Sequence, residues 1–281
     1  MMQHRCKLNE GSWIAADVAG TGPEILLLHG IPGAGVTWGE VAGRLSTQHR
    51  VIAPDLIGFG RSSRTDDIGA LWADAQATAV LAMLDELRSE QVLVVGHDFG
   101  GPVAAHLMAK APARVSGLVL ASANAFGDTP IPFPLSGILW PGVGDLCERL
   151  LFSKPSLRMM VKQGVGKNAP KLDAQVYVGD PRQARAIRVI FATALRELEA
   201  RYRPISKMLG RIEVPSMVVW GDRDPFFPVA QAERTARLIP GARMTVLSGA
   251  GHFLPEERPA ELAEAIEALA REIEAVGTRA Q

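Results

Sequence analysis

The segment Gln91–Pro102, with the sequence QVLVVGHDFGGP, constrains the fold more than any other part of the chain. Its apolar, β-branched residues Val92–Val95 have the composition of a buried strand, and Val103–Met108 has helical apolar spacing. Glycines stand two residues before and two residues after Asp98. Because glycine permits very tight turns, the side chain at the centre of such a turn is exposed. We therefore expect a strand, a sharp turn with Asp98 at its apex, and a helix.

The composition is typical of a globular protein and limits its partners. With 281 residues, of which 47% are hydrophobic, the chain can bury a large core. One domain with an insertion is the simplest arrangement at this length. Thirty basic and thirty acidic residues give zero net charge. Since no basic patch stands out, we expect neither nucleic acid nor a membrane surface as a partner. A monomer or a homodimer is expected.

The cysteines and the N-terminal segment indicate a cytoplasmic protein. Cys6 and Cys147 are the only cysteines. They are too few for a disulfide framework and lack the spacing of a zinc site, so we expect two reduced thiols. The N-terminal segment MMQHRCKLNEGSW has no apolar signal region, and no run of about 18 apolar residues occurs anywhere.

Apolar runs of strand length alternate with helical patterns along most of the chain. Two short antiparallel strands are expected first, at Gln3–Leu8 and Trp13–Val18. Further strands are expected at Glu24–Leu28, Arg50–Ala53, Val92–Val95, Val115–Leu120, Val214–Trp220 and Ala242–Leu247. Helices are expected at Val36–Leu45, Asp74–Leu87, Val229–Leu238 and Pro259–Val276. This alternation predicts an α/β protein with a mostly parallel sheet and helices on both faces.

The alternation stops between residues 125 and 210. This segment opens with four prolines between Thr129 and Pro141 and continues with short helix-like patterns. Its one strand signal is at Ala174–Val178. Because the segment is too long for a loop, we predict a mostly helical cap inserted over the sheet. Residues 1–124 and 211–281 would then form the core domain, and residues 125–210 the cap.

Two later loops carry a carboxylate and an imidazole at the ends of predicted strands. Asp224 follows Gly221 by three residues, and His252 lies in a glycine-containing loop that begins at Gly249. The carboxyl ends of parallel strands meet at one edge of a sheet, where ligands bind. Asp98, Asp224 and His252 are therefore expected near one another, in the chain order nucleophile, acid and base.

These features resemble the α/β-hydrolase superfamily over nearly the whole chain, from Trp13 to Ile273. An aspartate at the elbow, where that superfamily usually carries serine, resembles the epoxide hydrolases and haloalkane dehalogenases. The resemblance implies that Asp98 is the nucleophile, His252 the base and Asp224 the acid. Asp222 is the alternative acid, but the G-x-x-D spacing of the family favours Asp224. Asp222 is more simply interpreted as a residue that caps the turn.

The sequence His29-Gly-Ile-Pro32 resembles the H-G-x-P oxyanion loop of the same superfamily. By this resemblance, the backbone N–H groups of Ile31 and Phe99 would form the oxyanion hole. His29 is then expected to hold the loop, and His97 to pack beside the elbow.

A carboxylate nucleophile implies a two-step mechanism. A carboxylate needs no base to become nucleophilic, so Asp98 can attack an sp³ carbon and form an alkyl ester. His252, oriented by Asp224, would then deprotonate the water that cleaves the ester. Backbone donors would hold the oxyanion. The expected partners are a small apolar electrophile, either an epoxide or an alkyl halide, and water. We expect no metal and no organic cofactor.

The leaving group is predicted from the side chains that would bind it. The haloalkane dehalogenases that this chain resembles bind the halide through a Trp directly after the nucleophile and, in many members, an Asn in the H-G-N-P loop. Phe99 and Ile31 occupy these positions, and neither can donate from its side chain. Trp140 can replace one halide donor. Epoxide hydrolases use cap tyrosines as acids, and the two tyrosines of this chain, Tyr177 and Tyr202, both lie in the predicted cap.

The dipeptide Tyr202-Arg203 resembles the Tyr-Arg pair found late in epoxide hydrolase caps, although it lies closer to the following strand than in that family. We therefore favour epoxide hydrolysis. Dehalogenation of a haloalkane or haloacetate by the same three residues is the alternative. A ligand receptor on a hydrolase fold is the non-enzymatic alternative, because a fold alone does not establish activity.

Overall fold

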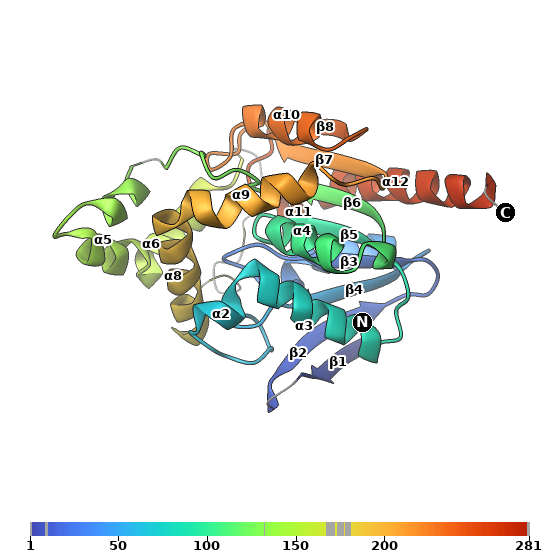
Figure 1. Ribbon diagram of the computed structural model, residues 1–281, viewed down its shortest axis with the longest axis horizontal. Helices are drawn as coiled ribbons and strands as arrows, with labels where there is room; N and C mark the ends of the chain where they lie inside the picture. The colour runs from blue at the N-terminus through green and yellow to red at the C-terminus, as the bar shows by residue number, and fades with distance from the viewer. Residues whose placement is uncertain are drawn as a thin grey trace.

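The computed structural model describes residues 2–8, 11–131, 133–166, 172, 177 and 181–279. Its centre is an eight-stranded sheet with the strand order β1-β2-β4-β3-β5-β6-β7-β8 (Figure 1). The strands are β1 (Met2–Lys7), β2 (Trp13–Ala19), β3 (Glu24–Leu28), β4 (Arg50–Asp55), β5 (Val92–His97), β6 (Val115–Ala121), β7 (Ser216–Gly221) and β8 (Arg243–Leu247). β2 pairs antiparallel with β1 and β4, and all other pairs are parallel. The predicted mostly parallel sheet is confirmed.

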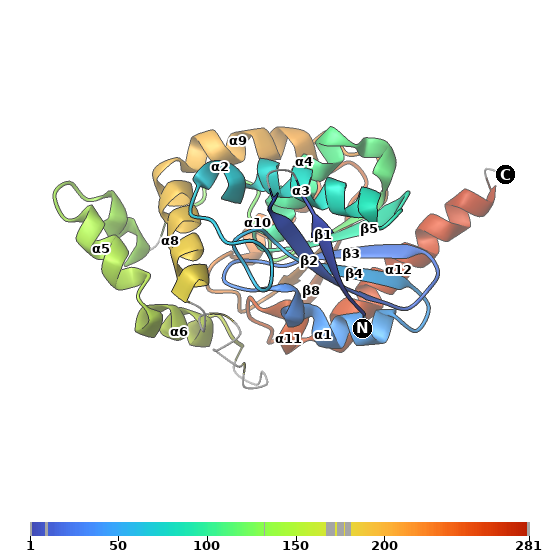
Figure 2. The same cartoon turned by 90° about the horizontal axis from the view of Figure 1, so that it is seen from below.

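Helices cover both faces of the sheet (Figure 2). The helices outside the β6–β7 connection are η2 (Gly35–Trp38), α1 (Gly39–Leu45), α2 (Ile68–Leu71), α3 (Ala73–Glu86), α4 (Gly100–Lys110), η3 (Pro112–Arg114), α10 (Val229–Leu238), α11 (Leu254–Glu257) and α12 (Pro259–Arg279). Leu26 and Leu28 of β3 pack in the apolar cluster that contains α3 and α4 residues. Ile25 and Leu27 pack in the cluster of α1 and α12. Because successive strand residues point to opposite faces, a continuous apolar run requires both helical layers.

Several element boundaries differ by a few residues from the sequence-based expectation, and two of these differences have a local cause. The helix expected from Val36 begins as the tighter 3-10 helix η2, because both the N–H and the hydroxyl of Thr37 donate to the carbonyl oxygen of Ala34. β7 begins at Ser216, after Pro215, rather than at Val214. Proline has no N–H to contribute to a strand ladder, which explains the later start.

Five described helices lie between β6 and β7. They are η4 (Leu135–Leu139), α5 (Gly144–Leu151), α6 (Lys154–Gln163), α8 (Pro181–Arg196) and α9 (Leu198–Leu209). α5, α6 and α8 lie beyond one end of the sheet, whereas α9 runs alongside α4 (Figures 1 and 2). The strand expected at Ala174–Val178 lies outside the described residues except for Tyr177, whose backbone is helical. The division into a core and an inserted cap stays a prediction.

Two further expectations concern the cysteines and the membrane. Cys6 and Cys147 are free thiols, as expected from the sequence. Among the helices of the described residues, none combines the length and the apolar character needed to cross a bilayer.

Candidate active site

Asp98 stands at the sharp turn between β5 and α4. Its backbone φ is 50°, in the left-handed region that non-glycine residues rarely adopt. A Cβ atom on Gly96 would lie 2.5 Å from the carbonyl oxygen of Gly100, and one on Gly100 would overlap the carbonyl oxygen of Leu28. Only glycine fits at these two positions, which explains the spacing around Asp98. The strained turn presents the carboxylate at the carboxyl end of the sheet.

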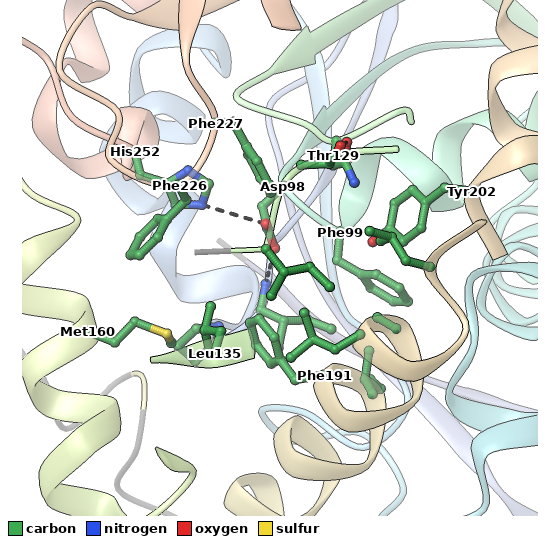
Figure 3. A pocket seen from close by; sticks show the side chains of 18 of the residues that line it. Asp98, Phe99, Thr129, Leu135, Met160, Phe191, Tyr202, Phe226, Phe227 and His252 are labelled. Atoms are coloured by element: carbon green, nitrogen blue, oxygen red, sulfur yellow. Dashed lines mark hydrogen bonds and ion pairs between the residues drawn. The ribbon is translucent and has the colours of Figure 1, made fainter. Parts of the chain in front are cut away.

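The Asp98 carboxylate faces a backbone donor on one side and an imidazole on the other (Figure 3). The N–H of Ile31 donates to Asp98 Oδ1 at 2.7 Å. His252 Nε2 lies 3.6 Å from Asp98 Oδ2. A Cβ atom on Gly30 would lie 2.5 Å from the Asp98 Cβ, so glycine permits the loop to approach the elbow this closely.

His29 holds this loop in place from inside the protein. Its Nε2 accepts the Leu56 N–H at 2.9 Å, so its Nδ1, 2.9 Å from the Gly30 carbonyl oxygen, carries the proton and donates. Burial lowers the pKa of His29 below its ordinary value of 6.5. The neutral ring therefore connects the Ile31 loop to the loop after β4, in line with the structural role expected from the sequence.

Asp224, rather than Asp222, contacts His252. Asp224 Oδ2 lies 2.9 Å from His252 Nδ1, and its Oδ1 accepts the N–H groups of Phe226 and Phe227 at 2.9 and 3.0 Å. Asp222 instead accepts the Gly249 N–H at 2.7 Å. The two backbone bonds fix the Asp224 carboxylate, which in turn orients the imidazole.

His252 is buried between two carboxylates, and their charges determine its protonation. Burial by itself would lower the pKa of His252, but the charge and hydrogen bond of Asp224 and the charge of Asp98 outweigh it and raise the pKa to about 10. For Asp98, burial by itself would raise the pKa. The ion pair with His252, together with the Ile31 N–H, outweighs burial and holds this pKa below its ordinary value of 3.8. At neutral pH, Asp98 is ionised and His252 protonated.

This ion pair should make the stability of the fold depend on pH. Because the folded-state pKa of His252 lies above its unfolded value of 6.5, its contribution is complete below that pH and is lost as pH rises through about 10. We expect the free energy of unfolding to fall by up to about 1.4 kcal/mol per pH unit above about pH 7. Urea titrations of the wild type and His252→Gln up to about pH 8.5 measure this. Equal slopes in the two proteins would contradict the raised pKa.

The last histidine near the elbow, His97, supports the backbone of His252. Burial, together with the charge of His252, lowers the pKa of His97 to about 4, so its ring is neutral at neutral pH. His97 Nε2 lies 2.8 Å from the His252 carbonyl oxygen, which can only accept, so the ring donates. The packing role expected for His97 thus includes a hydrogen bond.

Asp98 and His252 line a cavity of about 120 Å³ beneath the helices of the β6–β7 connection (Figure 3). The polar side chains on its described walls are Asp98, Asn124, Thr129, Tyr202 and His252. The remaining lining residues are Ile31, Pro32, Phe99, Pro130, Ile131, Leu135, Met160, Ile190, Phe191, Ala194, Leu195, Leu198, Phe226, Phe227 and Phe253. The cavity is therefore suited to a small apolar substrate with one polar group.

A family model described as alpha/beta hydrolase fold matches residues 23–259. The chain belongs to this family. Haloalkane dehalogenase 2 of Mycobacterium tuberculosis is 29% identical over 262 residues, covering 88% of this chain and 87% of that protein. The family and the fold expected from the sequence are thus confirmed, and the protein is an α/β-fold hydrolase.

Solved structures of this hydrolase fold carry different activities in their names. An esterase from Thermogutta terrifontis aligns with a TM-score of 0.80 and 24% identity, covering 97% of this chain and 99% of its own. The epoxide hydrolase CorEH aligns with a TM-score of 0.79 and 23% identity over the same shares. The shared fold therefore does not select the reaction, which has to be argued from the side chains in the cavity.

The three aromatic residues proposed from the sequence as substrate contacts lie in different places. Tyr202 of α9 lines the cavity, with its hydroxyl directed into it (Figure 3). Tyr177 is buried but is not among the described lining residues, and its ring packs on Phe253 at 5.1 Å between centroids. Trp140 is 52% exposed and stacks on Phe133 at the surface. Of the three, Tyr202 alone is among the described residues that line this cavity, and a role of Tyr177 or Trp140 in substrate binding stays a prediction.

Asn124 and Thr129 are polar lining residues that sequence reasoning missed. The Thr129 hydroxyl donates to Asn124 Oδ1 at 2.8 Å, and the Asn124 side chain lowers the pKa of Tyr202. Asn124 follows β6 by three residues, at the sheet edge that also carries Asp98. The rule that ligands bind beyond the carboxyl ends of parallel strands could have identified Asn124 from the sequence.

Proposed function

We propose that this α/β hydrolase opens epoxides to vicinal diols through an alkyl ester on Asp98. The observation that carries the proposal is an ionised carboxylate, held between Ile31 and His252, that opens onto an apolar cavity containing a phenol, Tyr202. This combination supplies a nucleophile at one end of the substrate and an acid for the oxygen that leaves.

In the first step, Asp98 attacks one epoxide carbon and the bond from that carbon to the ring oxygen breaks. The oxygen takes a proton from the Tyr202 hydroxyl, which leaves a hydroxyalkyl ester on Asp98 and a phenolate that solvent reprotonates. Burial and the charge of Asp98 raise the pKa of Tyr202 above its ordinary value, while the Asn124 side chain lowers it. Because the Tyr202 hydroxyl is directed into the cavity, its proton can point to the substrate (Figure 3).

In the second step, His252 activates water. Ester formation neutralises Asp98 and removes one of the two charges that raise the pKa of His252. The pKa of His252 should therefore fall in the intermediate, so that the imidazolium releases its Nε2 proton to solvent. The neutral Nε2 can then take the water proton while Asp224 holds Nδ1. Attack of the resulting hydroxide on the ester carbonyl gives a tetrahedral intermediate. When its bond to the alkyl oxygen breaks, the departing alkoxide takes the proton back from His252, which releases the diol and regenerates Asp98. The N–H groups of Ile31 and Phe99 are the proposed oxyanion donors.

The cavity favours an oxygen leaving group over a halide. A halide leaves as a stable anion and needs N–H donors rather than a proton. None of the described lining residues is a tryptophan, and the side chains of Ile31 and Phe99 cannot donate. Trp72 packs edge-on against Phe99 and is not among the described lining residues.

Haloalkane dehalogenation is the second candidate, supported by the 29% identity to haloalkane dehalogenase 2 of Mycobacterium tuberculosis. The Asp98 ester and its hydrolysis would be the same in both reactions. With no indole on the described walls, the halide would have to be bound by the remaining donors, the Asn124 amide and the hydroxyls of Thr129 and Tyr202. The two candidates therefore differ in the leaving group alone.

Turnover of styrene oxide and of 1-bromobutane decides between the two candidates. Diol formation from the epoxide, with little bromide release, is the expected result. Bromide release without diol formation would place dehalogenation first. Binding of both compounds without turnover of either would favour a ligand receptor. Asp98→Asn protein serves as the blank, because spontaneous epoxide hydrolysis also yields diol.

Replacement of Tyr202 with phenylalanine should slow ester formation from styrene oxide about a hundredfold or more, because the departing oxygen loses its proton donor. The fold should be little affected, since only a hydroxyl is removed. Rapid-quench mass spectrometry of the Asp98 ester measures this step. Tyr177→Phe is the matched control, because the Tyr177 hydroxyl is buried without a hydrogen-bond partner among the described residues. Normal ester formation in Tyr202→Phe would exclude Tyr202 as the acid.

A further inference from the structure

The buried carboxylate of Glu257 binds three backbone N–H groups around His252. Its Oε2 accepts the N–H of Gly166 at 2.7 Å and of Gly251 at 2.9 Å, and its Oε1 accepts the N–H of Phe253 at 2.9 Å. Gly251 and Phe253 flank His252 on both sides. Glu257 thus holds the loop of residues 249–253, which carries His252 and is called the base loop below. Glu257 is not among the described residues that line the cavity.

The third donor, Gly166, comes from the segment that follows α6 in the β6–β7 connection. This segment also bonds His252 directly, because the His252 N–H donates to the Gly164 carbonyl oxygen at 2.7 Å. A Cβ atom on Gly166 would overlap the carbonyl oxygen of Gly249, and a Cβ atom on Gly251 would overlap that of Gly164. The segment and the base loop therefore lie in backbone contact that side chains would prevent.

The backbone of His252 is consequently fixed at both of its polar atoms. The carbonyl oxygen accepts from His97, and the N–H donates to Gly164. The Glu257 carboxylate fixes the residues on either side. Hydrogen bonds from N–H groups to a buried carboxylate are about twice as strong as neutral ones, and removal of the acceptor leaves the donors unpaired.

We propose that Glu257 is a positioning residue that joins the Gly164–Gly166 segment to the base loop and so sets the position of His252 Nε2. This inference rests on the proposed function, in which His252 acts as a base in the second step only. Loss of the Glu257 carboxylate should therefore slow ester hydrolysis much more than ester formation by Asp98, because His252 keeps its charge beside Asp98. Displacement of a catalytic group by about 1 Å can cost on the order of a hundredfold in rate.

Glu257→Gln tests the proposal, because the amide keeps the size of the side chain but replaces one acceptor oxygen with a donor. We expect hydrolysis of the ester to slow at least about tenfold, so that ester accumulates in the steady state with styrene oxide. Rapid-quench mass spectrometry follows both steps separately. Glu261→Gln removes an exposed carboxylate of α12 and should behave as wild type. Folded Glu257→Gln protein with wild-type rates of both steps would overturn the proposal.

Gly166→Ala provides a second test with the carboxylate intact. The added Cβ should push the segment away from the base loop and thus also cause ester to accumulate. Normal hydrolysis in folded Gly166→Ala protein would exclude the coupling between segment and base. If His252→Gln forms no ester at all, the proposed function fails instead. The two failures are thus distinguishable.

Discussion

Replacement of Asp98 with asparagine is expected to abolish epoxide turnover, with a loss of about 10⁴-fold or more. An amide has nearly the same shape as a carboxylate but is a far weaker nucleophile. Its oxygen can still accept the Ile31 N–H that now binds Asp98 Oδ1, so the elbow should keep its conformation. Diol formation is measured in freshly prepared protein, because deamidation would restore the aspartate.

Asp222→Asn is the matched control for this experiment. It changes another loop aspartate, whose carboxylate binds the Gly249 N–H instead of His252. We expect it to retain most of the wild-type rate. Full activity of fresh Asp98→Asn protein, with its mass confirmed as the amide, would remove Asp98 from the mechanism.

Replacement of His252 with glutamine should stop turnover after one chemical step. Ester formation needs the Asp98 carboxylate, whereas ester hydrolysis needs a base to deprotonate water. The variant should therefore accumulate protein that carries the mass of the substrate on Asp98. Loss of the His252 charge also removes the main stabilisation of ionised Asp98, so ester formation should be slower than in the wild type.

Intact-protein mass spectrometry, followed by peptide mapping, checks the location of the ester. An inactive protein without added mass would show that the imidazole acts before the covalent step, as in serine hydrolases. Such a result would favour ester substrates over epoxides.

The amino-acid sequence by itself determined the elbow and the layered sheet. Both depend on local rules, because the overlap of a Cβ atom with a carbonyl group depends on the few residues around Asp98. Likewise, a strand that is apolar on both faces has to be covered on both faces. The positions of Asp224 and His252 at strand ends followed from the same parallel topology, since it collects these ends at one edge.

The tertiary structure alone decided which side chains reach the cavity. Tyr177, Tyr202 and Trp140 are aromatic residues in irregular connections, and their sequence positions do not say where each side chain points. In the folded chain, Tyr177 is buried against Phe253 and Trp140 lies at the surface. Tyr202 lines the same cavity as Asp98. These contacts join residues that are distant in the sequence, and no periodic pattern encodes them.

Glu257 illustrates the same limit. It lies in a short helix among other charged residues, and its sequence neighbours give no sign of a buried role. Only the folded chain brings Gly166 to within 2.7 Å of its carboxylate, from 91 residues away. The sequence shows where carboxylates occur. Whether a carboxylate is solvated or hydrogen-bonded inside the protein depends on which backbone donors the fold places beside it.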